Sequence, residues 1–223
     1  MAHLSKEFIL FYQDLAANNN RDWFHGNKKR YEQTVKKPFQ NFVTALIDAF
    51  KDVEPITEMT SKQAIFRINR DIRFSKDKTP YKLHASAAIS TTNKKDYANP
   101  KGIYIEINPD FIRQYGGLYG LNKEQLQNVR QGISQNLDRF QNLISDNQFI
   151  TTFEVLRGEK NKRIPKEFKP AHAKQPLIAN KQFYYYKEIS IDQIDSDDLI
   201  SIFISNYKKV LPLNNFFEEV LGG

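Results

Sequence analysis

Six basic side chains lie close together within the stretch AIFRINRDIRFSKDKTPYK, which runs from Ala64 to Lys82. Only Asp71 and Asp77 lie among them to offset their charge. Arginine side chains bind carboxylate and phosphate through paired hydrogen bonds, and a local surplus of cations attracts anions. The stretch therefore predicts a site for a small phosphorylated or carboxylated ligand. The predicted ligand-binding residues are Arg67, Arg70, Arg73, Ser75, Lys76, Lys78 and Lys82.

Two other interpretations of this stretch stay open. In the first, its arginines and the carboxylates near them satisfy one another on one face of a sheet and bind nothing else. In the second, the protein is an enzyme acting on phosphate esters, with Asp71, His84 and Glu106 as the candidate catalytic acids and bases. Asp71 and Glu106 would also suit Mg²⁺ held together with a phosphate substrate, although no spacing in the sequence demands the ion.

Motifs for metal, cofactor or nucleophile chemistry are missing from the sequence. It contains no cysteine, which excludes disulfides, thiolate metal sites and a cysteine nucleophile. The four histidines (His3, His25, His84 and His172) lack the close spacing typical of zinc ligands, so we predict no metal site. No P-loop, GxGxxG or GxSxG pattern is present, and the cofactor stays unknown.

The charge of the whole chain favours an anionic partner. The formal net charge of +7 suits a small anionic molecule, with a nucleic acid as the alternative. Tyr184, Tyr185 and Tyr186 would stack on single-stranded bases, although a strand explains these residues better. The cations at residues 28–30 and 36–37 are interpreted mostly as solvated helix surface.

No apolar run approaches the roughly 18 residues that a membrane-spanning helix needs. Charged and polar residues interrupt the apolar N-terminal stretch, which therefore reads as a helix and not as a secretory signal. We expect a cytoplasmic protein without a membrane partner. The sequence indicates no oligomeric state.

The spacing of apolar residues predicts the elements around the basic stretch. Strands are predicted at residues 66–68, 83–90, 103–107 and 183–189. The glycines at 116, 117 and 120 are interpreted as a turn or bulge, with a further short strand over residues 115–120 as the alternative. Helices are predicted from Ser5 to Asn18, from Tyr31 to Phe50, from Asn122 to Phe140, from Phe149 to Leu156, from Ser196 to Leu211, and around Phe216 to Leu221. Pro38 predicts either a kink in the second of these or two helices nearly in line, and Asn122 with Gln125 predicts a capping box at the start of the third.

Strands in the middle of the chain with helices on either side predict an α+β fold. We expect one domain over residues 1–223, with a mostly antiparallel central sheet packed by N-terminal, middle and C-terminal helices. If the strand at residues 66–68 continues, Phe66, Ile68, Ile72 and Phe74 would face the core. The opposite polar face would then collect Arg67, Asp71, Arg73, His84 and Glu106.

Three segments carry a resemblance to a known family. They are NNNRDWFHGNKKRYE at residues 18–32, RDIRFSKDKTPYK at 70–82 and KRIPKEFKPAHA at 162–173. Together they resemble the DUF2461 family of conserved uncharacterised proteins, although Glu167 stands where a glycine is more usual. The resemblance implies a single-domain protein of this length, and it supplies no reaction, cofactor or partner.

Overall fold

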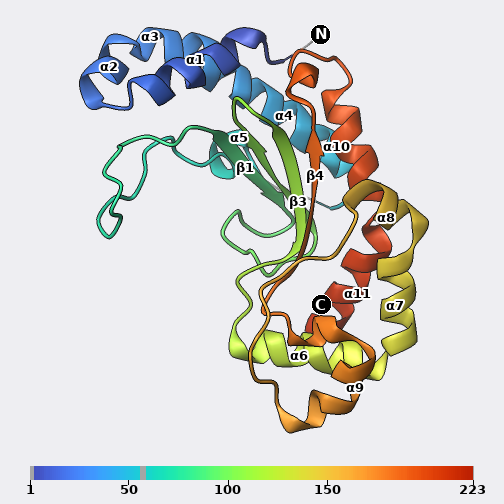
Figure 1. The fold of residues 1–223 in the computed structure, drawn as a ribbon. Helices are drawn as coiled ribbons and strands as arrows, with labels where there is room; N and C mark the ends of the chain where they lie inside the picture. Colours follow the sequence, from blue (N-terminus) through green and yellow to red (C-terminus); the bar gives the residue numbers. More distant parts are fainter. Residues whose placement is uncertain (1–2, 56–58, 223) are drawn as a thin grey trace. The chain divides into compact units, whose positions relative to one another are not determined.

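A four-stranded antiparallel sheet runs through the chain in the order β1-β2-β3-β4 (Figure 1). The computed structural model describes residues 3–55 and 59–222. Its strands are β1 (Ala85–Ser90), β2 (Gly102–Ile107), β3 (Ile112–Leu118) and β4 (Phe183–Ile189). The predicted α+β fold with an antiparallel central sheet is therefore confirmed.

The chain divides into two compact units, and every strand contributes residues to both. The first unit comprises Met1–Ile89, Tyr104–Gln114 and Glu188–Ile204, and the second comprises Ser90–Ile103, Tyr115–Lys187 and Ser205–Gly223. A single domain over residues 1–223 stays a prediction.

The first unit contains the predicted N-terminal helices, several short helices that were not predicted, and the start of a C-terminal helix. They are α1 (Lys6–Ala17), α2 (Arg21–Gly26), α3 (Lys28–Tyr31), η1 (Glu32–Lys36), α4 (Lys37–Lys51), α5 (Ser61–Ala64), η4 (Ile191–Gln193) and the first residues of α10 (Leu199–Lys208). Helix α4 buries one face, from Phe39 to Phe50, and its Phe42 contacts the ring of Phe203 in α10. These contacts anchor the helices that carry the candidate site.

The predicted break at Pro38 takes the form of a π-helical segment. Proline has no N–H to donate to the carbonyl four residues earlier, so the regular α pattern fails just ahead of it. Segment η1 lies in this position, and the Lys37 N–H donates to the Glu32 carbonyl, five residues back. π-helical segments are frequent at functional sites, because they change which side chains a helix presents.

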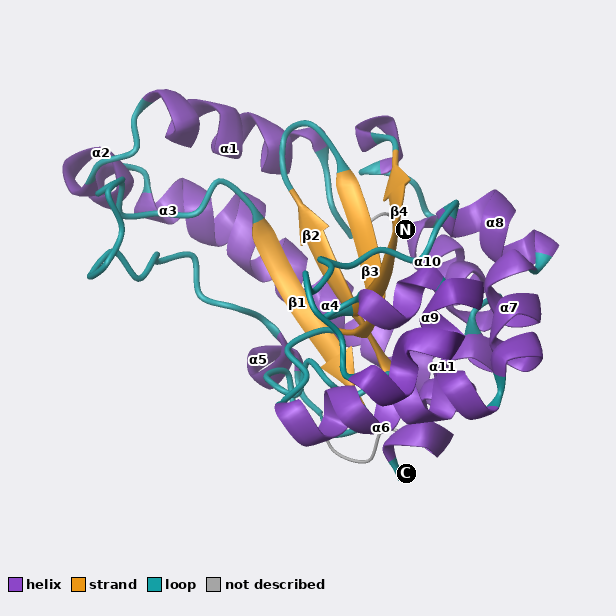
Figure 2. Cartoon of the chain, turned by 60° about the horizontal axis from the view of Figure 1, so that its bottom comes forward, coloured by secondary structure: helices purple, strands orange, loops and turns teal. Residues whose placement is uncertain are grey.

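The predicted strand at residues 66–68 is wrong. Residues 66–84 form a loop (the basic loop), which Figure 2 shows as a long teal segment between α5 and β1. Ile65 pairs with Ala87 of β1, but Asn69 pairs with Tyr81 of the same loop, so no continuous ladder forms. Ile68 is buried as expected, whereas the Phe74 side chain is 96% exposed.

The second unit contains the predicted middle and C-terminal helices, together with three short helices between residues 166 and 179 that were not predicted. They are α6 (Lys123–Gln135), α7 (Leu137–Ser145), α8 (Asn147–Phe153), η2 (Lys166–Phe168), α9 (Lys169–Lys174), η3 (Pro176–Ala179), the end of α10 and α11 (Leu211–Leu221). The capping box predicted at Asn122 and Gln125 starts α6. Gly117 lies within β3 at φ +90°, where a Cβ atom would meet the Phe183 carbonyl of β4.

The three consecutive tyrosines of β4 contact other residues of this second unit. Tyr185 is buried and donates a hydrogen bond to Asn214, whereas Tyr184 and Tyr186 contact the rings of Tyr119 and Tyr115. Their packing matches the expectation of a strand. Within residues 3–55 and 59–222, no helix has the length and apolar character needed to cross a membrane.

Candidate functional site

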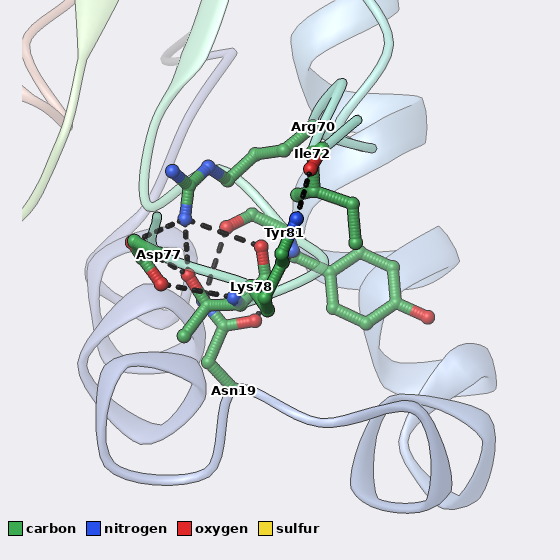
Figure 3. Close-up of polar contacts among 7 residues, drawn as sticks. Asn19, Arg70, Ile72, Asp77, Lys78 and Tyr81 are labelled. Carbon is green, nitrogen blue, oxygen red and sulfur yellow. Dashed lines mark hydrogen bonds and ion pairs between the residues drawn. The ribbon is translucent and has the colours of Figure 1, made fainter. Parts of the chain in front are cut away.

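The basic loop satisfies both of its carboxylates internally, as Figure 3 shows for Asp77. One guanidinium nitrogen of Arg70 donates to Asp77, to the Thr79 hydroxyl and to the Thr79 carbonyl. The Thr79 N–H donates to the Asp77 carboxylate at 2.9 Å. This backbone hydrogen bond, followed by that from Arg70, lowers the pKa of Asp77 to about 2.

The other acid pairs with its neighbour two residues along. Arg73 donates Nε to Asp71 Oδ1 at 2.9 Å and Nη2 to Asp71 Oδ2 at 2.7 Å. These side-chain hydrogen bonds are the main reason that the pKa of Asp71 falls to about 2. Asp71 is thus a hydrogen-bonded anion on an exposed surface, which is a poor setting for a proton-transfer group at neutral pH.

The remaining lysines of the loop do not join these pairs into one site. Lys78 Nζ donates to the Ile72 carbonyl at 2.9 Å (Figure 3), and Lys82 Nζ lies 5.5 Å from the centre of the Phe66 ring. Lys76 is exposed, and Ser75 is partly exposed. The loop therefore brings Arg70, Asp77 and Thr79 together, while Arg73 and Lys78 contact other parts of the loop.

An amide clamp fixes the base of the loop (Figure 3). The Asn19 side chain donates Nδ2 to the Tyr81 carbonyl at 3.0 Å and accepts from the Tyr81 N–H at 3.1 Å. The Tyr81 ring stacks on Phe24, with 4.1 Å between ring centres. The loop is therefore held against the junction of α1 and α2.

A cavity of about 370 Å³ lies in the first unit between the helices and the start of the basic loop. We call it the helix–loop pocket. Its charged and ionisable walls are Lys28, Glu32, Lys36, Lys62, Arg67 and His84, and its rings are Tyr12, Phe24, Tyr31, Phe39 and Phe66. The π-helical segment η1 supplies two of these walls, Glu32 and Lys36.

Cations outnumber acids on the pocket walls. Four permanent cations face one carboxylate, Glu32, which leaves a charge of about +3. Lys36 Nζ lies 3.9 Å from Glu32 Oε1. The side chains of Lys28, Lys62 and Arg67 are exposed and make no ion pair or hydrogen bond with any residue that the structure describes, although Arg67 lies within electrostatic range of Asp71. These three groups are available to an anion that enters the pocket.

His84 adds a neutral imidazole to the wall. Burial is the main cause that lowers its pKa, and Lys82 lowers it further, while Glu106 of β2 opposes both. The imidazole is therefore neutral at pH 7, where it accepts or donates a hydrogen bond without adding charge. Among the three catalytic candidates from the sequence, His84 is the one on this wall, and Glu106 lies in its electrostatic range.

The pocket retains one predicted ligand-binding residue and adds three others. Arg67 lines it, whereas Arg70, Arg73, Ser75, Lys76, Lys78 and Lys82 do not. Lys28, Lys36 and Lys62 were not predicted as site residues. A signal for the first two exists in the sequence, because Lys28, Glu32 and Lys36 recur every four residues beside the apolar Tyr31, Val35 and Phe39. Nothing local marks Lys62.

The part of the chain that the structure describes contains no group of three or more His, Cys, Asp or Glu side chains able to hold a metal ion.

A family model described as "Conserved hypothetical protein (DUF2461)" matches residues 7–216 of the 223-residue chain. A search of curated proteins finds no match for it.

Proposed function

Because the chain belongs to the DUF2461 family of conserved hypothetical proteins, whose description states no activity, we propose its function from the pocket itself. The protein binds a small phosphorylated or carboxylated ligand in the helix–loop pocket. The observation that carries this proposal is the unpaired positive charge of Lys28, Lys62 and Arg67 on the walls of one cavity.

The contrast within the basic loop supports this choice of residues. Arg70 and Arg73 already donate to Asp77 and Asp71, so a ligand would have to displace a protein carboxylate to use them. Arg67 comes from the same loop and makes no such pair. The cavity also lies within the range of about 300–1,000 Å³ that small-molecule sites occupy.

Isothermal titration calorimetry with inorganic phosphate, ribose 5-phosphate and citrate tests the proposal. We expect at least one of these anions to bind, with an affinity that falls as the salt concentration rises, because exposed charges are screened. Bound anion should also raise the temperature of unfolding by mass action. If none of the three binds the wild-type protein at low salt, the proposal is wrong.

Two alanine variants locate the binding site. Arg67→Ala should lower the affinity for the tightest-binding anion by about tenfold or more, since a hydrogen bond to a charged group contributes roughly 1.5–3 kcal/mol. Lys76→Ala removes the same charge from an exposed position of the same loop, outside the pocket, and should leave the affinity unchanged. Equal losses in both variants would point to general surface attraction.

A second candidate function rests on the tip of the basic loop. The Phe74 ring is 96% exposed, and the Arg73 guanidinium carbon lies 5.9 Å from its centre. An exposed ring among cations is the arrangement on which bases of single-stranded nucleic acid stack. This observation favours a nucleic-acid-binding module as the alternative.

Fluorescence anisotropy with a labelled single-stranded oligonucleotide separates the two candidates. If nucleic acid is the partner, Phe74→Ala should weaken binding about tenfold, because stacking contributes roughly 1–3 kcal/mol per base. Arg67→Ala should then change little. Binding that ignores Phe74, or that is absent at low salt, removes this alternative.

A further inference from the structure

The hydroxyl of Tyr12 is a polar group without a protein partner at the pocket. Tyr12 lines the cavity although its side chain is only 1% exposed, and its ring packs against Phe8 and Phe11 at 5.4 and 5.8 Å. Its hydroxyl makes no hydrogen bond with any residue in the described ranges 3–55 and 59–222. Because Tyr12 lines the cavity, a ligand that fills the cavity can form a hydrogen bond with this hydroxyl at a largely buried position.

A second phenol lies close to the first. Tyr31 also lines the pocket, and its hydroxyl likewise has no hydrogen-bond partner in the part of the chain that the structure covers. The two phenols are near enough to influence each other electrostatically. Burial, aided by Glu32, raises the pKa of Tyr31 to about 12, and burial raises that of Tyr12. Both groups keep their protons at neutral pH and so remain donors.

We propose that the two hydroxyls recognise an uncharged polar edge of the ligand, and that the ligand is an anion carried on a heteroaromatic ring, the class of the nucleoside monophosphates. This inference rests on the proposed function, since it concerns the same pocket. The phosphate contacts the exposed cations Lys28, Lys62 and Arg67, and the ring reaches inward to Tyr12 and Tyr31.

The charges and rings of the pocket decide between a charged and an uncharged inner group. Glu32 lies beside Tyr31, so a second negative charge at that end would meet repulsion. An uncharged ring nitrogen, carbonyl or amine pairs with the phenols without this penalty. The cavity is lined by the aromatic side chains Phe24, Phe39 and Phe66, which favour a planar ring over a flexible sugar.

Titration calorimetry with the four common nucleoside 5′-monophosphates, ribose 5-phosphate and inorganic phosphate tests the inference. We expect at least one nucleotide to bind about tenfold or more tighter than ribose 5-phosphate, because each added hydrogen bond contributes about that factor. If ribose 5-phosphate binds as tightly as every nucleotide, the inference fails while the proposed anion site stands. If inorganic phosphate, ribose 5-phosphate and all four nucleotides fail to bind, the inference falls together with the proposed site.

Removal of single hydroxyls separates ligand recognition from structure. Tyr12→Phe should reduce nucleotide affinity about tenfold and leave that for ribose 5-phosphate unchanged. Because no described residue bonds to this hydroxyl, the variant should unfold at a temperature no lower than that of the wild type. Tyr97→Phe, at an exposed tyrosine outside the pocket, is the matched control and should change neither quantity.

Tyr31→Phe repeats the test at a half-buried position, and it decides the question if Tyr12→Phe does not fold. A selective loss of nucleotide affinity in either folded variant supports the inference. Unchanged nucleotide affinity in both overturns it.

Discussion

Reversal of two charges, in the double variant Lys62→Glu/Arg67→Glu, is expected to abolish anion binding while the protein stays folded. The four cations and one carboxylate of the pocket give a charge of about +3. Two reversals change this by four, so the pocket becomes net negative at about −1. An anion then meets repulsion where it met attraction, and like charges at an interface cost several kcal/mol.

The expected loss of affinity is at least about 100-fold, which corresponds to roughly 2.7 kcal/mol. Folding should be almost unaffected, because both side chains are exposed and make no ion pair with a described residue. Titration calorimetry measures the affinity, and thermal unfolding without ligand verifies the fold.

The matched control is the double variant Lys76→Glu/Lys123→Glu. It changes the net charge of the protein by the same amount at two exposed positions that do not line the pocket. We expect less than a threefold change in affinity, because neither side chain lines the pocket and exposed surface charges are screened by salt. A similar loss in both double variants would show that the anion responds to total charge and not to this pocket.

Local patterns were enough to predict most of the elements. The alternation of Ile103, Ile105 and Ile107 indicated β2, and the aromatic run at residues 183–189 indicated β4 with the observed bounds. The same reasoning failed at residues 66–68, where two alternating residues imitate a strand. Whether such a segment joins a sheet depends on its partner, and Asn69 pairs with Tyr81 of its own loop instead of β1.

The candidate site was less predictable because packing assembles it. Arg67 was predicted from the local surplus of cations, but the partners of Arg70 and Arg73 depend on how the loop folds back. Lys28 and Lys36 looked like solvated helix surface, and only the approach of the loop turns that surface into a pocket wall. Tyr12 has the spacing of an ordinary core residue of an amphipathic helix. That spacing does not indicate that its hydroxyl lacks a hydrogen-bond partner.

Two of the three segments that carry the family resemblance meet in the structure. Asn19 and Phe24, from residues 18–32, both contact Tyr81, from residues 70–82. The first segment also supplies Lys28, Tyr31 and Glu32 to the pocket. The contact between the two segments therefore holds the basic loop beside the helices that form the pocket wall.

The amide clamp at this contact predicts a large effect on stability for Asn19→Ala. The paired residues Asn69 and Tyr81 do not bond to each other, since the flanking Arg70 and Lys82 N–H groups make the hydrogen bonds of that bridge. The N–H and carbonyl of Tyr81 point away from Asn69, and the Asn19 carboxamide bonds to both. Without it, a partly buried donor and acceptor lose their partners.

Each of the two groups that lose a partner costs roughly 1–3 kcal/mol, so Asn19→Ala should lower the free energy of unfolding by about 2–6 kcal/mol. Urea denaturation measures this loss. Asn18→Ala is the matched control, because the Asn18 side chain is exposed and donates only to the Asp14 carbonyl of its own helix. Its effect should stay within about 0.5 kcal/mol, as for most surface substitutions.

Asn19→Asp completes the series. The carboxylate still accepts from the Tyr81 N–H but cannot donate to the Tyr81 carbonyl, so its cost should approach that of the alanine variant. If Asn19→Ala instead loses no more stability than Asn18→Ala, water replaces the clamp without cost. The stacking of Tyr81 on Phe24 would then be what holds the base of the loop.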